Sequence, residues 1–374
     1  VVYLVFHRIA KGSKRNGSVF SHRRLGVYSR QGEPLAVRLD LFFGTVTMPV
    51  QMPGASDDHT LFVLTGPTAV GKTNLSLEWA EALGAEIVSC DPLLFYRGMD
   101  VGTAKPTPVQ LSQVRHHLID ITEVNQPLDI RAFVERAEAT VAEIRSRSRR
   151  VLVCGASGFY LQAFYRPVVD LVEIPADLRL RVRQQLEDEG LKPLLETLRR
   201  HNPQGLGGLD IQNPRRVVRA LERCLASGRD MESLRVEMAA QTNSLIRARK
   251  VTVRLSRDRA ELDQRIARRV DEMLRDGLIP EVEGLLANGL ESNPSAASAV
   301  GYRETIEWLR NPGSEEALAV AITGNTRRLA RKQLSWFRNK LPDHPVIELQ
   351  EGGEDGSSAL VSSFSGTGGS MEIP

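Results

Sequence analysis

Cysteine is scarce in this chain of 374 residues. The three cysteines, Cys90, Cys154 and Cys224, are an odd number and have none of the spacings that bind a metal. Two of them end apolar runs, which is typical of buried free thiols. This usage fits a reducing compartment, and we expect the protein to act in the cytoplasm.

Long apolar runs are also missing. Because no stretch of 18 or more apolar residues occurs, we expect no membrane-spanning helix. Charge of one sign is not in large excess either, since the formal net charge is only +3. Any affinity for nucleic acid must therefore come from local basic patches. A hydrophobic content of 41% with 25% charged residues is ordinary for a globular protein with a substantial core.

Acidic residues are absent before Glu33, and residues 1–60 are basic and begin with Val. A transit peptide has this composition. We favour the alternative that 1–60 is an upstream extension of the reading frame, with Met48 or Met52 as the start, and we expect it to be disordered or not native. Residues 350–374 are rich in Gly and Ser and are predicted to be a disordered tail.

One stretch carries the strongest signal in the chain. Apolar residues 61–64 run into the pattern Gly-x-x-x-x-Gly-Lys-Thr, and an apolar helical pattern follows, as a phosphate-binding loop requires. Glycines let successive N–H groups face phosphate oxygens, and the helix N-terminus adds partial positive charge. We expect Lys72 to contact the terminal phosphate and the Thr73 hydroxyl to bind Mg²⁺. The predicted phosphate-binding residues are Gly66, Pro67, Thr68, Ala69, Val70, Gly71, Lys72 and Thr73.

Strand and helix patterns alternate around this loop, which predicts the α/β class with a parallel sheet covered by helices. The expected strands are 61–64, 85–90, 150–154 and 250–255, with a long amphipathic helix over 130–146. Between 175 and 248 the pattern is polar and entirely helical. The predicted organisation is a phosphate-loop core in two parts, 61–174 and 249–349, with an all-helical insertion over 175–248.

Polar groups follow the carboxyl ends of the predicted strands, where ligands bind in open α/β sheets. Asp91 ends the second strand and can serve as a general base or as a partner of Mg²⁺. The alternative is a carboxylate that caps the next turn. Ser157, in a Gly-flanked turn, can donate a hydrogen bond to a leaving oxygen, although an ordinary turn serine also fits. The strand before Ser157 lacks the terminal carboxylate that an NTPase uses for Mg²⁺, which weakens an ATPase assignment.

Basic residues gather in three places. They are Arg179, Arg181 and Arg183; Arg215, Arg216 and Arg219; and Arg327, Arg328, Arg331 and Lys332. One such run is often a solvated helix face. Three of them, with Trp336 and Phe337 beside the last, indicate a polyanion bound through its phosphates.

The same segments, in this order, resemble the tRNA dimethylallyltransferases (isopentenyltransferases) of bacterial type. The resemblance is carried by residues 66–73, 96–106, 116–120, 213–222, 299–304 and 333–338. It implies a nucleotide-kinase-like fold, in which a dimethylallyl group moves from dimethylallyl diphosphate to the exocyclic N6 amine of an adenosine. That adenosine lies 3′ to the anticodon in tRNAs that read codons beginning with U. The implied cofactor is Mg²⁺, the partner is the anticodon stem-loop of tRNA, and we expect a monomer.

The resemblance also assigns roles. Asp91 would accept the amine proton, and Ser157 would hydrogen-bond the leaving group or the reacting centre. The positions that match tRNA contacts are Asp91, Pro92, Leu93, Leu94, Ser157, Arg181, Arg215, Arg216, Val217, Val218 and Arg219. Pro92 replaces the usual Ser, and Ser157 replaces the usual Thr.

His116 and His117 have no partner acids or cysteines at ligand spacing, so we predict a structural role for them. An ATP-dependent small-molecule kinase is the alternative enzyme, because a phosphate loop followed by a strand that ends in an aspartate also suits phosphoryl transfer. An RNA-binding protein without catalysis is the third possibility.

Overall fold

The computed structural model of the protein describes residues 59–351 and, outside this range, the backbone of five short strands. These strands are β1 (Val2–Leu4), β2 (Gly26–Tyr28), β3 (Ala36–Arg38), β4 (Met48–Val50) and β11 (Ala359–Val361). β1 pairs with β4 and β2 with β3, both antiparallel. The segments 1–60 and 350–374 are predicted to be disordered. Apart from these strands and residues 59, 60, 350 and 351, they lie outside the described residues.

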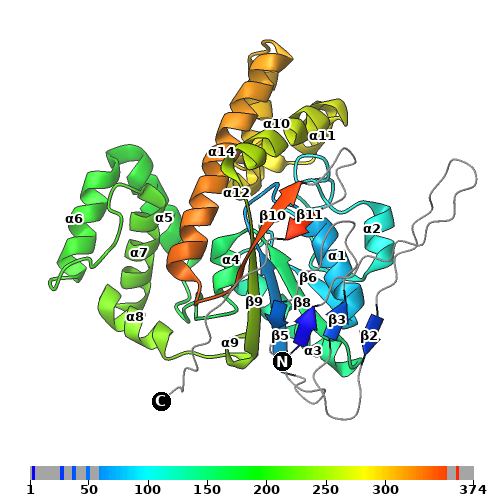
Figure 1. Ribbon diagram of the computed structural model, residues 1–374. Helices are drawn as coiled ribbons and strands as arrows, with labels where there is room; N and C mark the ends of the chain where they lie inside the picture. Colours follow the sequence, from blue (N-terminus) through cyan, green and yellow to red (C-terminus); the bar gives the residue numbers. More distant parts are fainter. Residues whose placement is uncertain are drawn as a thin grey trace, which may run out of the picture. The chain divides into compact units, whose positions relative to one another are not determined.

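A parallel sheet forms the centre of the larger compact unit, in the order β10-β9-β5-β8-β6-β7, and β11 pairs antiparallel with β10 (Figure 1). The strands are β5 (Thr60–Thr65), β6 (Ala85–Ser89), β7 (His116–His117), β8 (Arg150–Gly155), β9 (Arg249–Arg257) and β10 (Val346–Glu351). All residues of β5 and β6 are buried, as expected for parallel strands covered by helices on both faces. The predicted α/β fold is confirmed.

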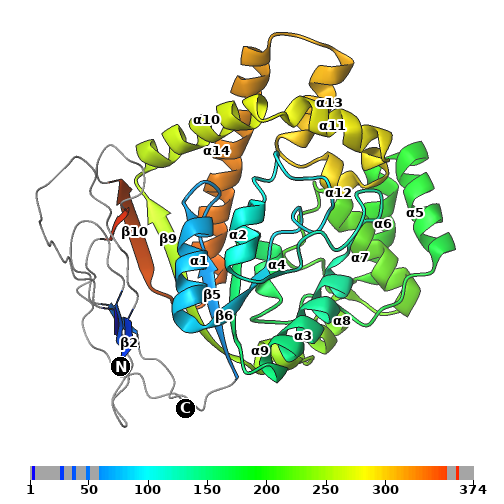
Figure 2. The ribbon, with the colours of Figure 1, turned by 90° about the vertical axis from the view of Figure 1, so that its right-hand side faces the viewer.

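Helices of this unit begin and end at recognisable signals. Asp129, Asp258 and Ser314 cap α3, α10 and α14 by accepting hydrogen bonds from first-turn N–H groups. α10 and α14 lie side by side (Figure 2). The bounds are α1 (Lys72–Leu83), α2 (Pro108–Gln113), α3 (Ile130–Ser146), α4 (Gly158–Gln162), α10 (Arg259–Arg275), α11 (Leu278–Ala287), a 3₁₀ turn (Leu290–Ser292), α12 (Pro294–Ala297), α13 (Tyr302–Arg310) and α14 (Glu315–Lys340).

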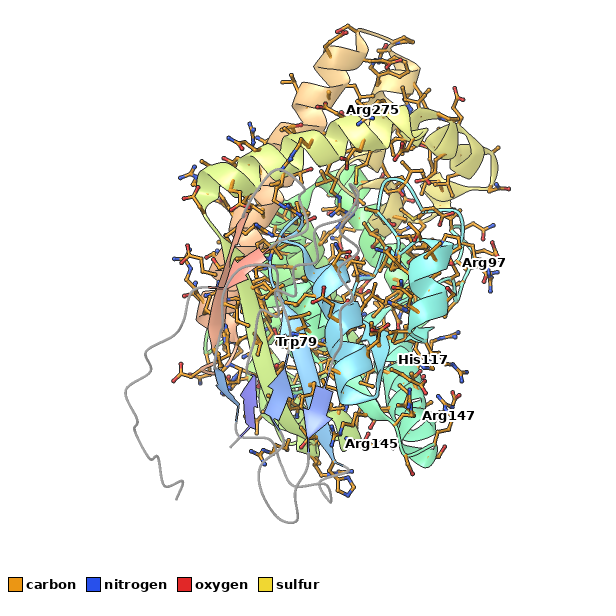
Figure 3. The ribbon with its side chains drawn as sticks, turned by 45° about the vertical axis from the view of Figure 1, so that its right-hand side comes forward. Trp79, Arg97, His117, Arg145, Arg147 and Arg275 are labelled. Carbon is orange, nitrogen blue, oxygen red and sulfur yellow. The ribbon has the colours of Figure 1, made fainter. Side chains whose placement is uncertain are left out.

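A buried ion-pair group lies at the start of β6, at the other end of the strand from Asp91. Glu86, 5% exposed, binds His117 Nε2 at 2.6 Å and Arg147 Nη2 at 2.8 Å. Figure 3 shows both partners on this part of the core. His116 bonds the carbonyl of Val114 through Nδ1 at 2.7 Å. Both histidines therefore have structural partners, as their lack of ligand spacing predicted.

The second compact unit comprises residues 162–247 and is entirely helical in its regular elements. It overlaps the segment 175–248 predicted as an insertion. Its helices are α5 (Ala176–Glu189), α6 (Leu191–His201), α7 (Pro214–Ser227), α8 (Met231–Ala239) and α9 (Ser244–Arg247). Leu194 and Leu198 of α6 pack with Val217 and Leu221 of α7 in its own hydrophobic core. Across the described ranges, no helix combines the length and apolar character needed to cross a bilayer.

Candidate active site at the phosphate-binding loop

The loop between β5 and α1 has the backbone shape of an anion-binding turn. Gly66 lies so close to the neighbouring strand that a Cβ there would come within 2.8 Å of the Leu255 carbonyl oxygen. Gly71 has φ +104, and α1 begins at the next residue, Lys72. Ala69 also has a left-handed backbone, with φ +61, which is unusual for a residue that carries a Cβ. These conformations turn the loop peptides into a concave nest.

Cationic side chains hold the carbonyl groups of this loop. Lys72 Nζ donates to the oxygens of Gly66 at 3.0 Å and Pro67 at 2.7 Å. Arg265 Nε donates to the Ala69 oxygen at 2.9 Å, and Arg257 Nε to the Val70 oxygen at 2.9 Å. Because N–H and C=O of one peptide point in opposite directions, fixing the carbonyls also orients the N–H groups between them. The loop therefore combines oriented donors with three nearby cations.

The Lys72 ammonium is partly protected from water in this arrangement. Burial lowers the pKa of Lys72 to about 8, with Arg269 acting in the same direction and Cys154 and Asp91 opposing it. The pKa of Arg269 is also lowered, first by burial, while Asp91 opposes that shift. Arg269 Nη2 in turn donates to the Thr103 oxygen at 2.9 Å. Lys72, Arg269 and Asp91 thus form one electrostatic group.

Asp91 lies at the carboxyl end of β6, next to the end of β8. The Cys90 N–H donates to the Cys154 oxygen at 2.8 Å, and a Cβ at Gly155 would meet the Cys90 carbonyl carbon at 2.8 Å. Asp91 Oδ1 accepts the N–H of Leu93 at 3.1 Å, so the carboxylate does cap the following turn. Burial raises the pKa of Asp91 above its ordinary value, while the Leu93 N–H, Lys72 and Arg269 oppose the rise. Its surroundings give it greater basicity than an exposed aspartate without removing its cationic neighbours.

Ser157 follows the end of β8, and its side chain is partly exposed. The Ser157 carbonyl accepts the Leu161 N–H at 2.9 Å, while its hydroxyl has no hydrogen-bond partner in the described part of the chain. Gly158, the next residue, is covered by α14, because a Cβ there would come within 2.3 Å of the Trp336 ring. The hydroxyl is therefore available to a ligand on a turn whose backbone is closely packed.

Residues predicted to bind Mg²⁺ and tRNA lie at the start of α1 and in the turn after Asp91. Thr73 lies in the first turn of α1. Among the described residues, no three or more His, Cys, Asp or Glu side chains lie close enough together to hold a metal ion. Pro92, Leu93 and Leu94 form the partly exposed turn after Asp91. A metal at this loop would depend on the Thr73 hydroxyl and on oxygens of a bound phosphate, a donor set that Mg²⁺ accepts.

The helical unit displays its predicted basic residues on the surface. Arg215, Arg216 and Arg219 are exposed on α7, and Arg219 approaches Glu222 at 3.7 Å. Arg181 is exposed and pairs with Asp177 at 2.5 Å. Val218 is partly exposed. Val217 is fully buried in the core of the unit, so its side chain is not available to a ligand.

Sequence reasoning missed the residues that hold the loop from other elements. Arg257 ends β9 and Arg265 lies on α10; both bind loop carbonyls, whereas Arg269, one turn after Arg265, bonds the Thr103 carbonyl. Gln333 of α14 also reaches the loop, since its Oε1 accepts the Thr68 N–H at 2.9 Å. A charged helix normally indicates a solvated face, and nothing local distinguishes these side chains.

A glycine-containing loop between a central parallel strand and a helix, with lysine and arginines around it, defines a P-loop protein. Within that class, the family model described as IPP transferase matches residues 94–340. The chain belongs to this family, and the resemblance found in the sequence is confirmed.

Comparison with individual relatives supports the same family. The chain is 51% identical to a tRNA dimethylallyltransferase of Opitutus terrae, over 79% of this chain and 94% of the relative. A crystal structure of a tRNA isopentenylpyrophosphate transferase from Bacillus halodurans is 31% identical, with a TM-score of 0.56, covering 78% of this chain and 90% of that one. A eukaryotic dimethylallyltransferase, described as acting on tRNA, shares the fold with a TM-score of 0.67 at 22% identity, covering 77% of this chain and 73% of that one.

Proposed function

We propose that this protein transfers a dimethylallyl group from dimethylallyl diphosphate to the N6 amine of the adenosine 3′ to the anticodon, in tRNAs that read codons beginning with U. The observation that carries the proposal is the phosphate loop with Asp91 at its edge, in a chain that belongs to the IPP transferase family. Family membership favours it over a small-molecule kinase and over a non-catalytic RNA-binding protein. We further propose that the enzyme acts as a monomer in the cytoplasm.

The loop would bind the diphosphate of the donor. N–H groups of residues 69–73, with Lys72 and the arginines of α10, would neutralise the charge that grows on the bridging oxygen as the bond to the prenyl carbon breaks. If Mg²⁺ is bound, the Thr73 hydroxyl and the diphosphate oxygens would hold it, and it would supply further charge neutralisation. Ser157 would donate a hydrogen bond to the leaving group.

Asp91 would act as the base. The adenine amine nitrogen forms a bond to the first carbon of the prenyl group, the carbon–oxygen bond to diphosphate breaks, and the amine proton passes to the Asp91 carboxylate. Burial raises the Asp91 pKa, which favours proton acceptance, while Lys72 and Arg269 keep the carboxylate ionised. The Leu93 N–H fixes Oδ1, so that Pro92, which has no N–H, does not need to orient this carboxylate.

Each unit, taken by itself, carries basic side chains that suit contacts with RNA. Exposed arginines of α7 (Arg215, Arg216 and Arg219), and Arg181 of α5, suit contacts with phosphates of the anticodon stem-loop. On α14, Arg331 and Lys332 are exposed and have no ion-pair partner among the described residues. The target base would leave its stack, which costs roughly a few kcal/mol and less in a single-stranded loop.

The direct test incubates the protein with Mg²⁺, radiolabelled dimethylallyl diphosphate and unmodified tRNA, followed by digestion to nucleosides. The expected product is a labelled adenosine from the position next to the anticodon. A matched tRNA with guanosine at that position should take up no label. Failure of transfer by a folded protein, together with turnover of ATP, would refute the proposal in favour of a kinase.

A further inference from the structure

α14 contacts both loops of the candidate site through two side chains of one helical turn. Gln333 Oε1 accepts the N–H of Thr68 at the tip of the phosphate loop, at 2.9 Å. Trp336, three residues later, covers Gly158 next to Ser157. Both contacts cross long sequence distances within the same compact unit. Because both side chains come from α14, they fix the tip of the phosphate loop relative to the turn after β8.

The Gln333 contact lies beside the strained residue of the loop. Ala69 has φ +61, a conformation that an isolated alanine avoids. Such strain persists only where the surrounding structure determines the backbone on both sides. Here Gln333 holds the Pro67–Thr68 peptide, one peptide unit before the Thr68–Ala69 peptide, through the Thr68 N–H. Arg265 and Arg257 hold the carbonyls of Ala69 and Val70 on the other side.

We infer that Gln333 is a positioning residue for diphosphate binding, which keeps Ala69 in its left-handed conformation and thereby orients the loop N–H groups. This inference rests on the proposed function for the identity of the ligand. Gln333 donates nothing to the diphosphate in this role. Its loss would free the Thr68 N–H, so that the backbone at Thr68 could turn, Ala69 could relax toward the common φ range, and loop N–H groups would turn away from the anion.

The test measures binding of inorganic diphosphate with Mg²⁺ to the full-length protein by calorimetry. Gln333→Met keeps the length of the side chain and removes the acceptor, and should weaken diphosphate binding about tenfold. Ser335→Ala, on the exposed side of the same helix, is the control and should bind as the unaltered protein does. The KM for dimethylallyl diphosphate should rise with that Kd, while the affinity for tRNA stays constant.

A second background separates positioning from general damage. Glycine adopts positive φ without a steric cost, so Ala69→Gly should make the loop less dependent on Gln333. In that background Gln333→Met should cost less than about threefold in diphosphate affinity. An equal loss in both backgrounds, or no loss in either, would overturn the inference. If the unaltered protein bound no diphosphate at all, the proposed function would fail first and this inference with it.

Discussion

The ionisation of Lys72 predicts how donor capture depends on pH. Because burial lowers its pKa to about 8, the charged fraction should fall from about nine-tenths at pH 7 to about one-tenth at pH 9. The quantity kcat/KM for dimethylallyl diphosphate reports the free enzyme. If the ammonium is required to capture the donor, kcat/KM should therefore drop about tenfold over this range, with a midpoint near 8. At saturating donor, bound diphosphate raises the Lys72 pKa, so kcat should decline only at higher pH.

Lys72→Arg is the matched variant for this assay. A guanidinium stays protonated throughout the range, so the variant should lose the alkaline decline even if its overall rate is low. The assay follows the formation of labelled tRNA at limiting donor and saturating tRNA, in buffers of constant ionic strength between about pH 6.5 and 9.5. A decline with the same midpoint in Lys72→Arg would assign the titration to another group. A flat profile for the unaltered protein would refute the role given to the buried ammonium.

Three other predictions concern separate parts of the molecule. Asp91→Asn should reduce kcat by about 10²–10⁴-fold with little change in tRNA affinity. It should also remove the acid limb of the pH–rate profile, which lies above the ordinary aspartate pKa because burial raises the pKa of Asp91. A variant with normal turnover would exclude Asp91 as the base. Replacing Arg215 and Arg219 by Gln should reduce the slope of log K against log salt for tRNA by roughly one unit per lost phosphate contact, and an unchanged slope would return them to a solvated face. Glu86→Gln should lower the free energy of unfolding by about 1–3 kcal/mol in urea titrations, whereas Glu143→Gln, on the exposed side of the same ion-pair group, should have little effect; equal effects would contradict the buried role of Glu86.

Much of the core could be predicted because its signals are local. The strands β5, β6 and β8 contain apolar runs, β9 alternates apolar and polar residues, and α3 has a 3.6-residue pattern with Asp129 as its cap. β7 and β10 were not predicted. β7 comprises only two residues, and β10 lies next to a polar, glycine-rich stretch that gives no clear boundary. Short length at the edge of the sheet hid β7, and the composition of the neighbouring stretch hid β10.

The residues of the candidate site likewise divide into those that the sequence predicts and those that it does not. The loop, Asp91 and Ser157 are visible in the sequence because each follows a predicted strand. Arg257, Arg265 and Gln333 are not, because their role depends on hydrogen bonds to main-chain groups far away in the chain. Val217 shows the opposite error, since a run of neighbouring tRNA positions on a helix includes one residue that faces the core. Periodicity along α7 would have separated it from its arginine neighbours.

The supports of the phosphate loop have a consequence for the order in which the protein matures. The loop is made early by the ribosome, but β5 pairs with β9, and the Thr68 N–H is bound by a residue 265 positions later. Until α14 has emerged, the nascent chain carries the complete glycine motif without the Gln333 contact that holds its tip. Incomplete chains should therefore be unable to capture the prenyl donor, so that diphosphate binding marks a finished molecule.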